Sequence, residues 1–93
     1  MSIAIEFIDR QRPNVVQIDT FVPITDRNQI KIGDRFVCPP SEEYKSGIVD
    51  VRTMKPILCT VKFIHDWHIG FSYYPNGKRC ASIAWDLCYT PIE

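Results

Sequence analysis

A chain of 93 residues has room for one hydrophobic core, so we expect a single domain that spans residues 1–93. Eleven Lys and Arg residues balance eleven Asp and Glu residues, which argues against a DNA mimic and disfavours nucleic-acid binding, because both functions need a strong field of one sign. The sequence has no run of roughly 20 apolar residues and no signal-peptide pattern, so we expect a cytoplasmic protein that contacts no membrane.

The first third of the chain is expected to be extended. Apolar and β-branched residues alternate with polar ones over residues 2–8 and 15–22, which predicts two strands in an N-terminal β extension over residues 1–29. Gly33-Asp34 then suits a tight turn that leads into a strand, and Pro39-Pro40 ends that strand.

Short alternating segments continue to the end of the chain, with Asn76-Gly77 as the strongest turn signal among them. Strands are expected over residues 47–53, 58–64 and 67–74, and a last one within residues 80–87. The residues expected to share the buried faces of these strands include Val49, Val51, Cys59, Val61, Phe63, Trp67, Tyr73, Ile83 and Trp85. Pro91 is expected to end the ordered part.

This pattern predicts an all-β or mainly β protein, because seven prolines leave no long stretch for a helix. About five short strands with hairpin-length connections favour a small, SH3-like, partly open barrel over residues 30–93. An OB-like barrel is the alternative.

Catalytic and metal-binding chemistry is not expected. Four cysteines, at 38, 59, 80 and 88, are spaced too widely for a zinc knuckle, and His65 and His68 need not converge. Reduced, buried cysteines that act as small hydrophobes are the favoured interpretation. Cys80 follows the basic pair Lys78-Arg79 and is the candidate nucleophile for a minor redox or enzymatic hypothesis. We expect a protein that is not an enzyme and holds no cofactor and no metal.

Aromatic and basic side chains in the second half provide the candidate binding surface. Lys62, His68 and Tyr74 share the face opposite the expected core, so one patch of them would receive a peptide, a base or a partner protein. Tyr44, in an exposed acidic loop over residues 41–46, either joins a ligand groove or folds back over the core. The candidate binding residues are Tyr44, Lys62, His68, Tyr74, Lys78 and Arg79.

The segment Ile32-Gly33-Asp34-Arg35-Phe36-Val37, followed by a Val-rich strand, an aromatic strand and a strand with Ile83 and Trp85, resembles small SH3-like-barrel accessory proteins of bacteriophages and prophages. The resemblance covers residues 30–90. It implies a phage-encoded protein that acts by binding, and some such proteins inhibit host defence systems as anti-CRISPR proteins do. It specifies no catalytic residue.

Two functions of different classes follow from these observations. The first is a non-enzymatic protein-binding module, in its sharpest form a phage inhibitor of a host defence enzyme that covers part of its partner's surface. The second is a nucleic-acid-binding barrel that uses a basic and aromatic strip of Lys62, His68, Tyr74, Lys78 and Arg79. The partner of the first is a host protein or a second copy of the chain, since an N-terminal edge strand would support a homodimer.

Overall fold

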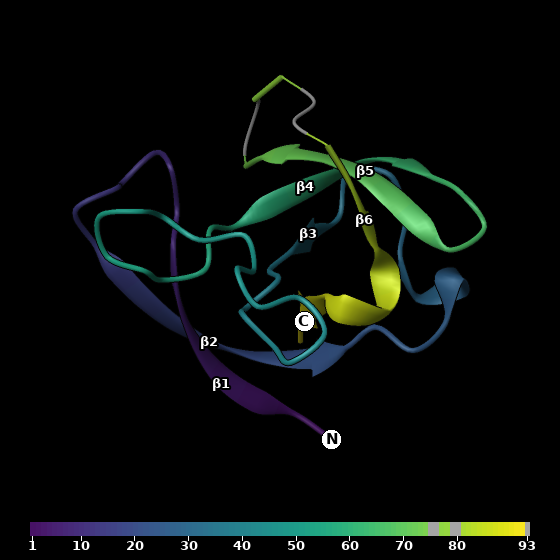
Figure 1. Cartoon of the computed structure of the whole chain (residues 1–93), viewed down its shortest axis with the longest axis horizontal. Coiled ribbons are helices and arrows are strands. Elements are labelled where there is room, and N and C mark those ends of the chain that lie inside the picture. Colours follow the sequence, from purple (N-terminus) through teal and green to yellow (C-terminus); the bar gives the residue numbers. More distant parts are fainter. Residues whose placement is uncertain (75–76, 79–80, 93) are drawn as a thin grey trace.

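The computed structural model describes residues 1–74, 77–78 and 81–92, which form seven strands in two antiparallel sheets (Figure 1). The strands are β1 (Ile3–Ile8), β2 (Val16–Pro23), β3 (Arg35–Phe36), β4 (Cys59–Ile64), β5 (His68–Tyr73), β6 (Ala81–Ala84) and β7 (Tyr89–Pro91). The helical segments among these residues are two 3-10 turns, η1 (Arg27–Gln29) and η2 (Trp85–Leu87), and no helix is long and apolar enough to cross a membrane. The prediction of a mainly β protein is confirmed.

The N-terminal β extension forms the hairpin of β1 and β2, which pairs with β7 in a three-stranded sheet of order β1-β2-β7. Its inner face buries Ile5, Phe7 and Phe21. The Phe7 and Phe21 rings meet edge to face, with their centroids 5.6 Å apart, a favoured geometry for aromatic pairs. Val37 and Leu58 complete this smaller core cluster.

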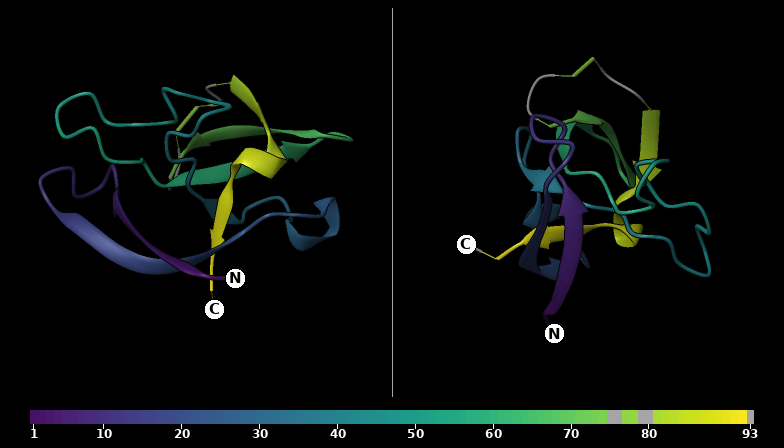
Figure 2. Two further views of the ribbon diagram at one scale, coloured as in Figure 1. Left: turned by 60° about the horizontal axis from the view of Figure 1, so that its bottom comes forward. Right: turned by 90° about the vertical axis from the view of Figure 1, so that its left-hand side faces the viewer.

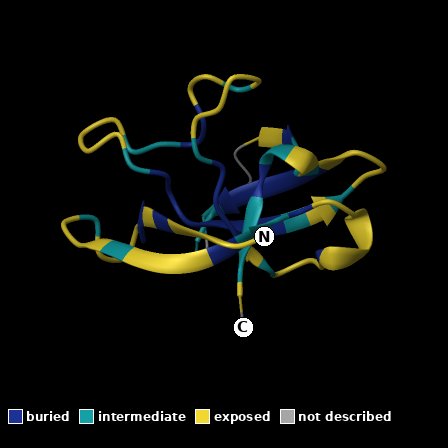
Figure 3. Cartoon of the chain, turned by 90° about the horizontal axis from the view of Figure 1, so that it is seen from below, coloured by how far each residue is buried: buried dark blue, intermediate teal, exposed yellow. Residues whose placement is uncertain are grey.

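The second sheet has the order β3-β4-β5-β6 and covers the larger core cluster. Its central strands β4 and β5 are mostly buried, whereas the β1–β2 hairpin is exposed over much of its length (Figure 3). The buried members of the larger cluster are Ile24, Ile30, Phe36, Cys38, Ile48, Ile57, Cys59, Val61, Ile69, Phe71, Ile83 and Cys88. Most of the four-stranded sheet's apolar residues therefore face one core, as their alternation predicts.

The two sheets are joined where the chain end passes from β6 through η2 to β7, as Figure 2 shows. Val37 and Tyr89 exchange two backbone hydrogen bonds of 2.9 Å at this junction. Here Phe36 and Cys38 face the larger cluster and Val37 the smaller one, so both faces of the segment are buried. The sheets do not close into one barrel, because β1 and β6 remain at their edges.

The strand predicted over residues 47–53 is wrong. Val49 makes an isolated bridge with Pro56, and Val51 is 84% exposed. The chain turns back here because the Asp50 carboxylate accepts bonds from the backbone and hydroxyl of Thr53, while Met54 donates its N–H to the Asp50 carbonyl at 2.7 Å. A hairpin loop therefore replaces the predicted strand.

The last strand, β7, was not predicted, because Pro91 was expected to end the ordered part. Pro91 lies in β7, opposite Phe21 of β2. Proline is tolerated in a strand where no donor is needed from its nitrogen. The strand predicted within residues 80–87 is confirmed as β6 (Ala81–Ala84), with Ile83 buried, whereas Trp85 begins the 3-10 turn η2 and packs against the core from there.

Candidate functional site

The turn between β4 and β5 brings several aromatic side chains to one end of the four-stranded sheet. The pairing of Ile64 with Ile69 continues to His65, whose N–H donates to the His68 carbonyl at 2.8 Å. Asp66 and Trp67 therefore form a two-residue hairpin turn. The prediction that Trp67 faces inward on a strand is wrong: Trp67 lies in the turn and is 71% exposed.

A bulge in β4 determines which aromatic residues reach this surface. Val61 pairs with Phe71, but the next pair joins Phe63 to Gly70, so Lys62 is an extra residue in β4. An extra residue reverses the alternation of faces beyond it. Phe63 is consequently 39% exposed and its predicted inward position is wrong, whereas Ile64 turns inward and packs against the larger cluster.

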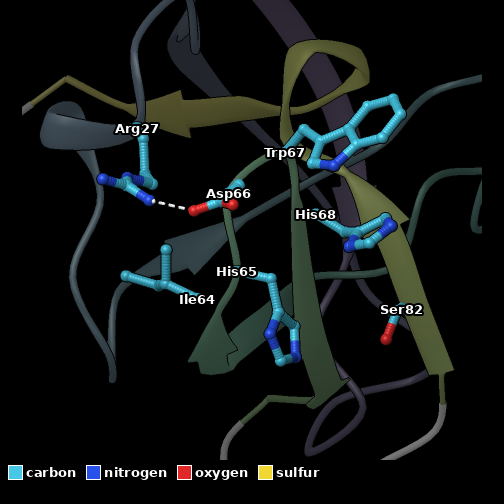
Figure 4. A pocket seen from close by; sticks show the side chains of 7 residues that line it. All are labelled: Arg27, Ile64, His65, Asp66, Trp67, His68 and Ser82. Atoms are coloured by element: carbon cyan, nitrogen blue, oxygen red, sulfur yellow. Dashed lines mark hydrogen bonds and ion pairs between the residues drawn. The ribbon is translucent and has the colours of Figure 1, made fainter.

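Four neighbouring rings result, which we call the aromatic row: Phe63, His65, His68 and Trp67. The ring centroids of Phe63 and His65 are 5.9 Å apart, and those of His65 and His68 are 6.0 Å apart. The Trp67 indole stacks on the His68 imidazole at 5.7 Å, with 15° between the planes. Figure 4 shows Trp67 beside His68, and His65 on the segment that follows β4. All four side chains are exposed to solvent.

The hairpin turn is tethered to the body of the protein at two points. The Arg27 guanidinium donates to the Asp66 carboxylate at 2.9 Å (Figure 4), and the Trp85 indole N–H donates to the Asp66 carbonyl at 3.2 Å. A capping box between Asp26 and Gln29 holds the short turn that carries Arg27. The aromatic row is therefore presented on a constrained hairpin.

The row borders a pocket of about 500 Å³ that carries no excess charge. The pocket is lined by Arg27, Ile64, His65, Asp66, Trp67, His68 and Ser82. The formal charges of Arg27 and Asp66 cancel, with the histidines counted as neutral. Because both partners are exposed, their ion pair contributes only about 0.2–1 kcal/mol to stability. The pocket offers aromatic area and hydrogen-bonding groups rather than a strong field.

The structure brings one of the predicted binding residues, His68, into the aromatic row. Tyr74 lies beyond the other end of β5, roughly 20 Å along the strand direction, and packs against the smaller cluster. Lys62 is half-buried at the bulge, and Tyr44 packs against the larger cluster. The expected patch of Lys62, His68 and Tyr74 is therefore not assembled as one surface.

The remaining predicted residues, Lys78 and Arg79, follow β5 in the sequence. Lys78 is exposed, whereas Arg79 and the candidate nucleophile Cys80 lie outside the described residues, as does most of the expected turn around Asn76-Gly77. Sequence reasoning missed Arg27, Phe63 and Trp67 as surface residues. The signal for Trp67 was the polar His65-Asp66 pair between two apolar strands, which is typical of a hairpin turn.

The described cysteines have structural environments rather than catalytic ones. Cys38, Cys59 and Cys88 are buried, as predicted. A hydrogen bond with Cys38 and the burial of the thiol raise the pKa of Cys88 far above its ordinary range, so Cys88 stays protonated at neutral pH. Within the described residues, no three His, Cys, Asp or Glu side chains are grouped to hold a metal ion.

Comparison with known proteins adds no family to this description. No family model matches the chain, and neither a curated protein nor a solved structure matches it. The contacts, burial and charge of the residues at the end of the β4–β5 hairpin are therefore the basis on which a function is assigned.

Proposed function

We propose that this chain is a non-enzymatic protein-binding module and that the aromatic row is its main contact surface. The observation that carries the proposal is the 71% exposure of Trp67, whose ring is stacked on His68 rather than buried in the core. Tryptophan is enriched among the few residues that dominate binding energy at protein interfaces. A large apolar ring exposed on a tethered hairpin is the arrangement that such an anchor requires.

The constrained geometry of the hairpin supports this proposal. Ordering a flexible side chain or loop on binding costs free energy that reduces affinity. Asp66 is already held by Arg27 and by Trp85, and the His65–His68 hydrogen bond closes the turn. Much of this ordering cost is therefore met before a partner arrives, so Trp67 can contribute a larger share of its contact energy.

The charge of the site favours a protein partner over a nucleic acid. Phosphate recognition needs Lys or Arg side chains whose counterions are released on binding. Of the described residues that line the pocket, Arg27 alone is a Lys or Arg. Its charge is paired with that of Asp66. The more specific predictions, a phage inhibitor of a host defence enzyme and an SH3-like form of the sheets, depend on the resemblance of residues 30–90.

The proposal is tested by immobilising the wild-type chain, Trp67→Ala and Val51→Ala and comparing the proteins that each retains from a bacterial lysate. Val51 is 84% exposed on another loop, so its variant is a matched control for loss of exposed apolar area. We expect a stoichiometric protein partner that survives a high-salt wash on the wild type and on Val51→Ala and is lost on Trp67→Ala. Equal retention by all three would contradict a role for the aromatic row.

Single-stranded nucleic acid is a second candidate ligand, because the row of rings resembles the stacking platforms on which bases bind. Binding of a fluorescent oligonucleotide to the same three variants separates the two functions. Affinity that falls steeply with salt and is lost in Trp67→Ala would favour nucleic acid. Absence of binding at low salt would leave the protein-binding function.

A further inference from the structure

Strand β1 has an open edge on the side away from β2. The hydrogen bonds of Ile8 show which of its residues direct their backbone N–H and C=O groups to that side. Ile8 donates its N–H to the Pro56 carbonyl and accepts from the Leu58 N–H, both at 2.9 Å, so its backbone groups point away from β2. In a strand, alternate residues direct these groups to the same side. Ala4 and Glu6 therefore present their N–H and C=O groups at the open edge, where no described strand pairs with them.

This edge lacks the features that usually prevent strand association. Natural edge strands carry Pro, Lys or a bulge that discourages pairing. The β1–β2 register runs without interruption from Ile3 to Ile8, and β1 contains neither Pro nor Lys. The charge of Glu6 is paired with Lys55, whose Nζ lies 2.6 Å from the Glu6 carboxylate. The edge is thus both unprotected and close to neutral.

Ile3 is an apolar side chain on the inner face of β1 that the structure leaves partly uncovered. It shares the inner face of the strand with Ile5 and Phe7, which are 8% and 6% exposed. Ile3 itself is 41% exposed, although it is apolar like the two buried residues of this face. An additional strand along β1 would cover this side chain.

The other sheet has an edge at β6, but that edge is partly engaged. The Ala84 carbonyl accepts the Cys88 thiol at a sulfur–oxygen distance of 3.6 Å, and Ser82 takes part in a further interaction. The β1 edge is consequently the better template for an added strand.

We propose that β1 pairs antiparallel with β1 of a second copy of this chain, about a two-fold axis at Ala4. Ala4 then lies opposite Ala4 of the second copy, and Glu6 lies opposite its Ser2. Each of these pairs exchanges two backbone hydrogen bonds, and Ile3 lies beside Ile5 of the second copy. The result is one continuous six-stranded sheet made from the two three-stranded sheets.

Antiparallel β1–β1 pairings about an axis at Ile5 or Glu6 are less favourable than the pairing about Ala4. An axis at Ile5 would place Ser2 opposite Ile8, whose backbone groups are already bonded to Pro56 and Leu58. An axis at Glu6 would place two like-charged carboxylates opposite each other, which is destabilising. A strand that pairs with itself is self-complementary in the antiparallel direction, which makes a second copy the occupant that the edge fits.

The mass of the protein in solution tests the pairing. Sedimentation equilibrium over a concentration series should show the wild type rising from 10.8 kDa toward twice that mass. Ala4→Val keeps the N–H and should behave like the wild type. Ala4→Pro removes only an N–H that β2 does not use, so it should stay folded and remain monomeric. A monomeric wild type at every concentration, or a dimeric Ala4→Pro, would overturn the proposal.

A crosslinking experiment tests the register and does not depend on the proline variant. In a Cys80→Ser background, Ala4→Cys should form a disulfide-linked dimer under mild oxidation, because facing Cα atoms lie about 5.5 Å apart. Glu6→Cys is the matched control, since the two copies of residue 6 would be roughly 13 Å apart along the strands. Equal crosslinking of both variants, or of neither, would overturn the register. The aromatic row belongs to the other sheet, so this result is independent of the proposed function.

Discussion

Individual residues show where the chain has little freedom to change, and Gly47 is the clearest case. Gly47 has φ = +57° and lies against the backbone of the Pro39-Pro40 segment. A Cβ atom at this position would lie 2.6 Å from the Pro40 nitrogen and 2.8 Å from the Cys38 carbonyl oxygen. Backbone atoms cannot move aside as a flexible side chain can. Glycine is therefore required here by space as well as by conformation.

We predict that Gly47→Ala lowers the free energy of unfolding by about 3 kcal/mol, because the strain of a positive φ adds to the clash with the backbone. Gly33→Ala is the matched control, since Gly33 has φ = +96° but no atom lies within 4 Å of the place that a Cβ would take there. It should lose only about 1–2 kcal/mol. Urea unfolding of both variants measures the difference, and equal losses would contradict the steric argument.

At the scale of a strand, β4 combines a bulge with a buried hydroxyl, that of Thr60. Thr60 is 6% exposed, and its Oγ1 forms no hydrogen bond within the described part of the chain. A buried hydroxyl without a partner retains the cost of leaving water. Strand β4 therefore contains a position at which the sequence is not optimal for stability.

Thr60→Val should raise the free energy of unfolding by about 1 kcal/mol, because valine keeps the shape and the β preference of threonine and removes the hydroxyl. Thr90→Val is the control, and it should lower the free energy of unfolding. The Thr90 hydroxyl donates to the Arg35 carbonyl at 3.3 Å, and valine removes this hydrogen bond. The two shifts are read from urea midpoints. A destabilised Thr60→Val would show that the hydroxyl has a role in this strand.

Strands could be predicted from alternation, but their exact faces could not. β1, β2, β4 and β5 lie where the pattern of apolar residues places them. Phe63 and Trp67 were assigned to the wrong face because a one-residue bulge and a two-residue turn each change the alternation, and neither leaves a Gly or Pro as a signal. The candidate site is built from these two irregularities, so it was largely missed.

At the scale of the whole molecule, the division into two sheets was beyond the reach of local pattern. The pairing of Phe21 with Pro91 joins distant parts of the chain, and periodicity contains no information about which strands become neighbours. The continuous apolar runs at residues 36–38 and 57–59 did indicate that these segments are buried on both faces. Their neighbouring side chains face different core clusters, and such runs are typical of segments buried on both faces.

The larger core cluster links global stability to pH through Cys88. The Cys38 hydrogen bond and burial raise the pKa of Cys88 in the folded state, and the same bond lowers the pKa of Cys38. In the unfolded chain both thiols lose their protons near the ordinary value of 9.0. Above that pH the unfolded chain therefore binds fewer protons than the folded chain. The stabilisation that Cys88 contributes is fully present below about pH 9 and declines as the pH rises.

We predict that the free energy of unfolding falls by about 1.4 kcal/mol per pH unit above about pH 9 on account of this thiol. Cys88→Ala should be less stable at neutral pH, because it leaves a cavity in a buried site, but its stability should decline less steeply in alkali. Urea unfolding under reducing conditions from neutral to alkaline pH measures both slopes. Parallel profiles for the two proteins would mean that Cys88 ionises equally in the folded and unfolded states. A steeper decline in the wild type would show that the folded state is stabilised by a protonated Cys88.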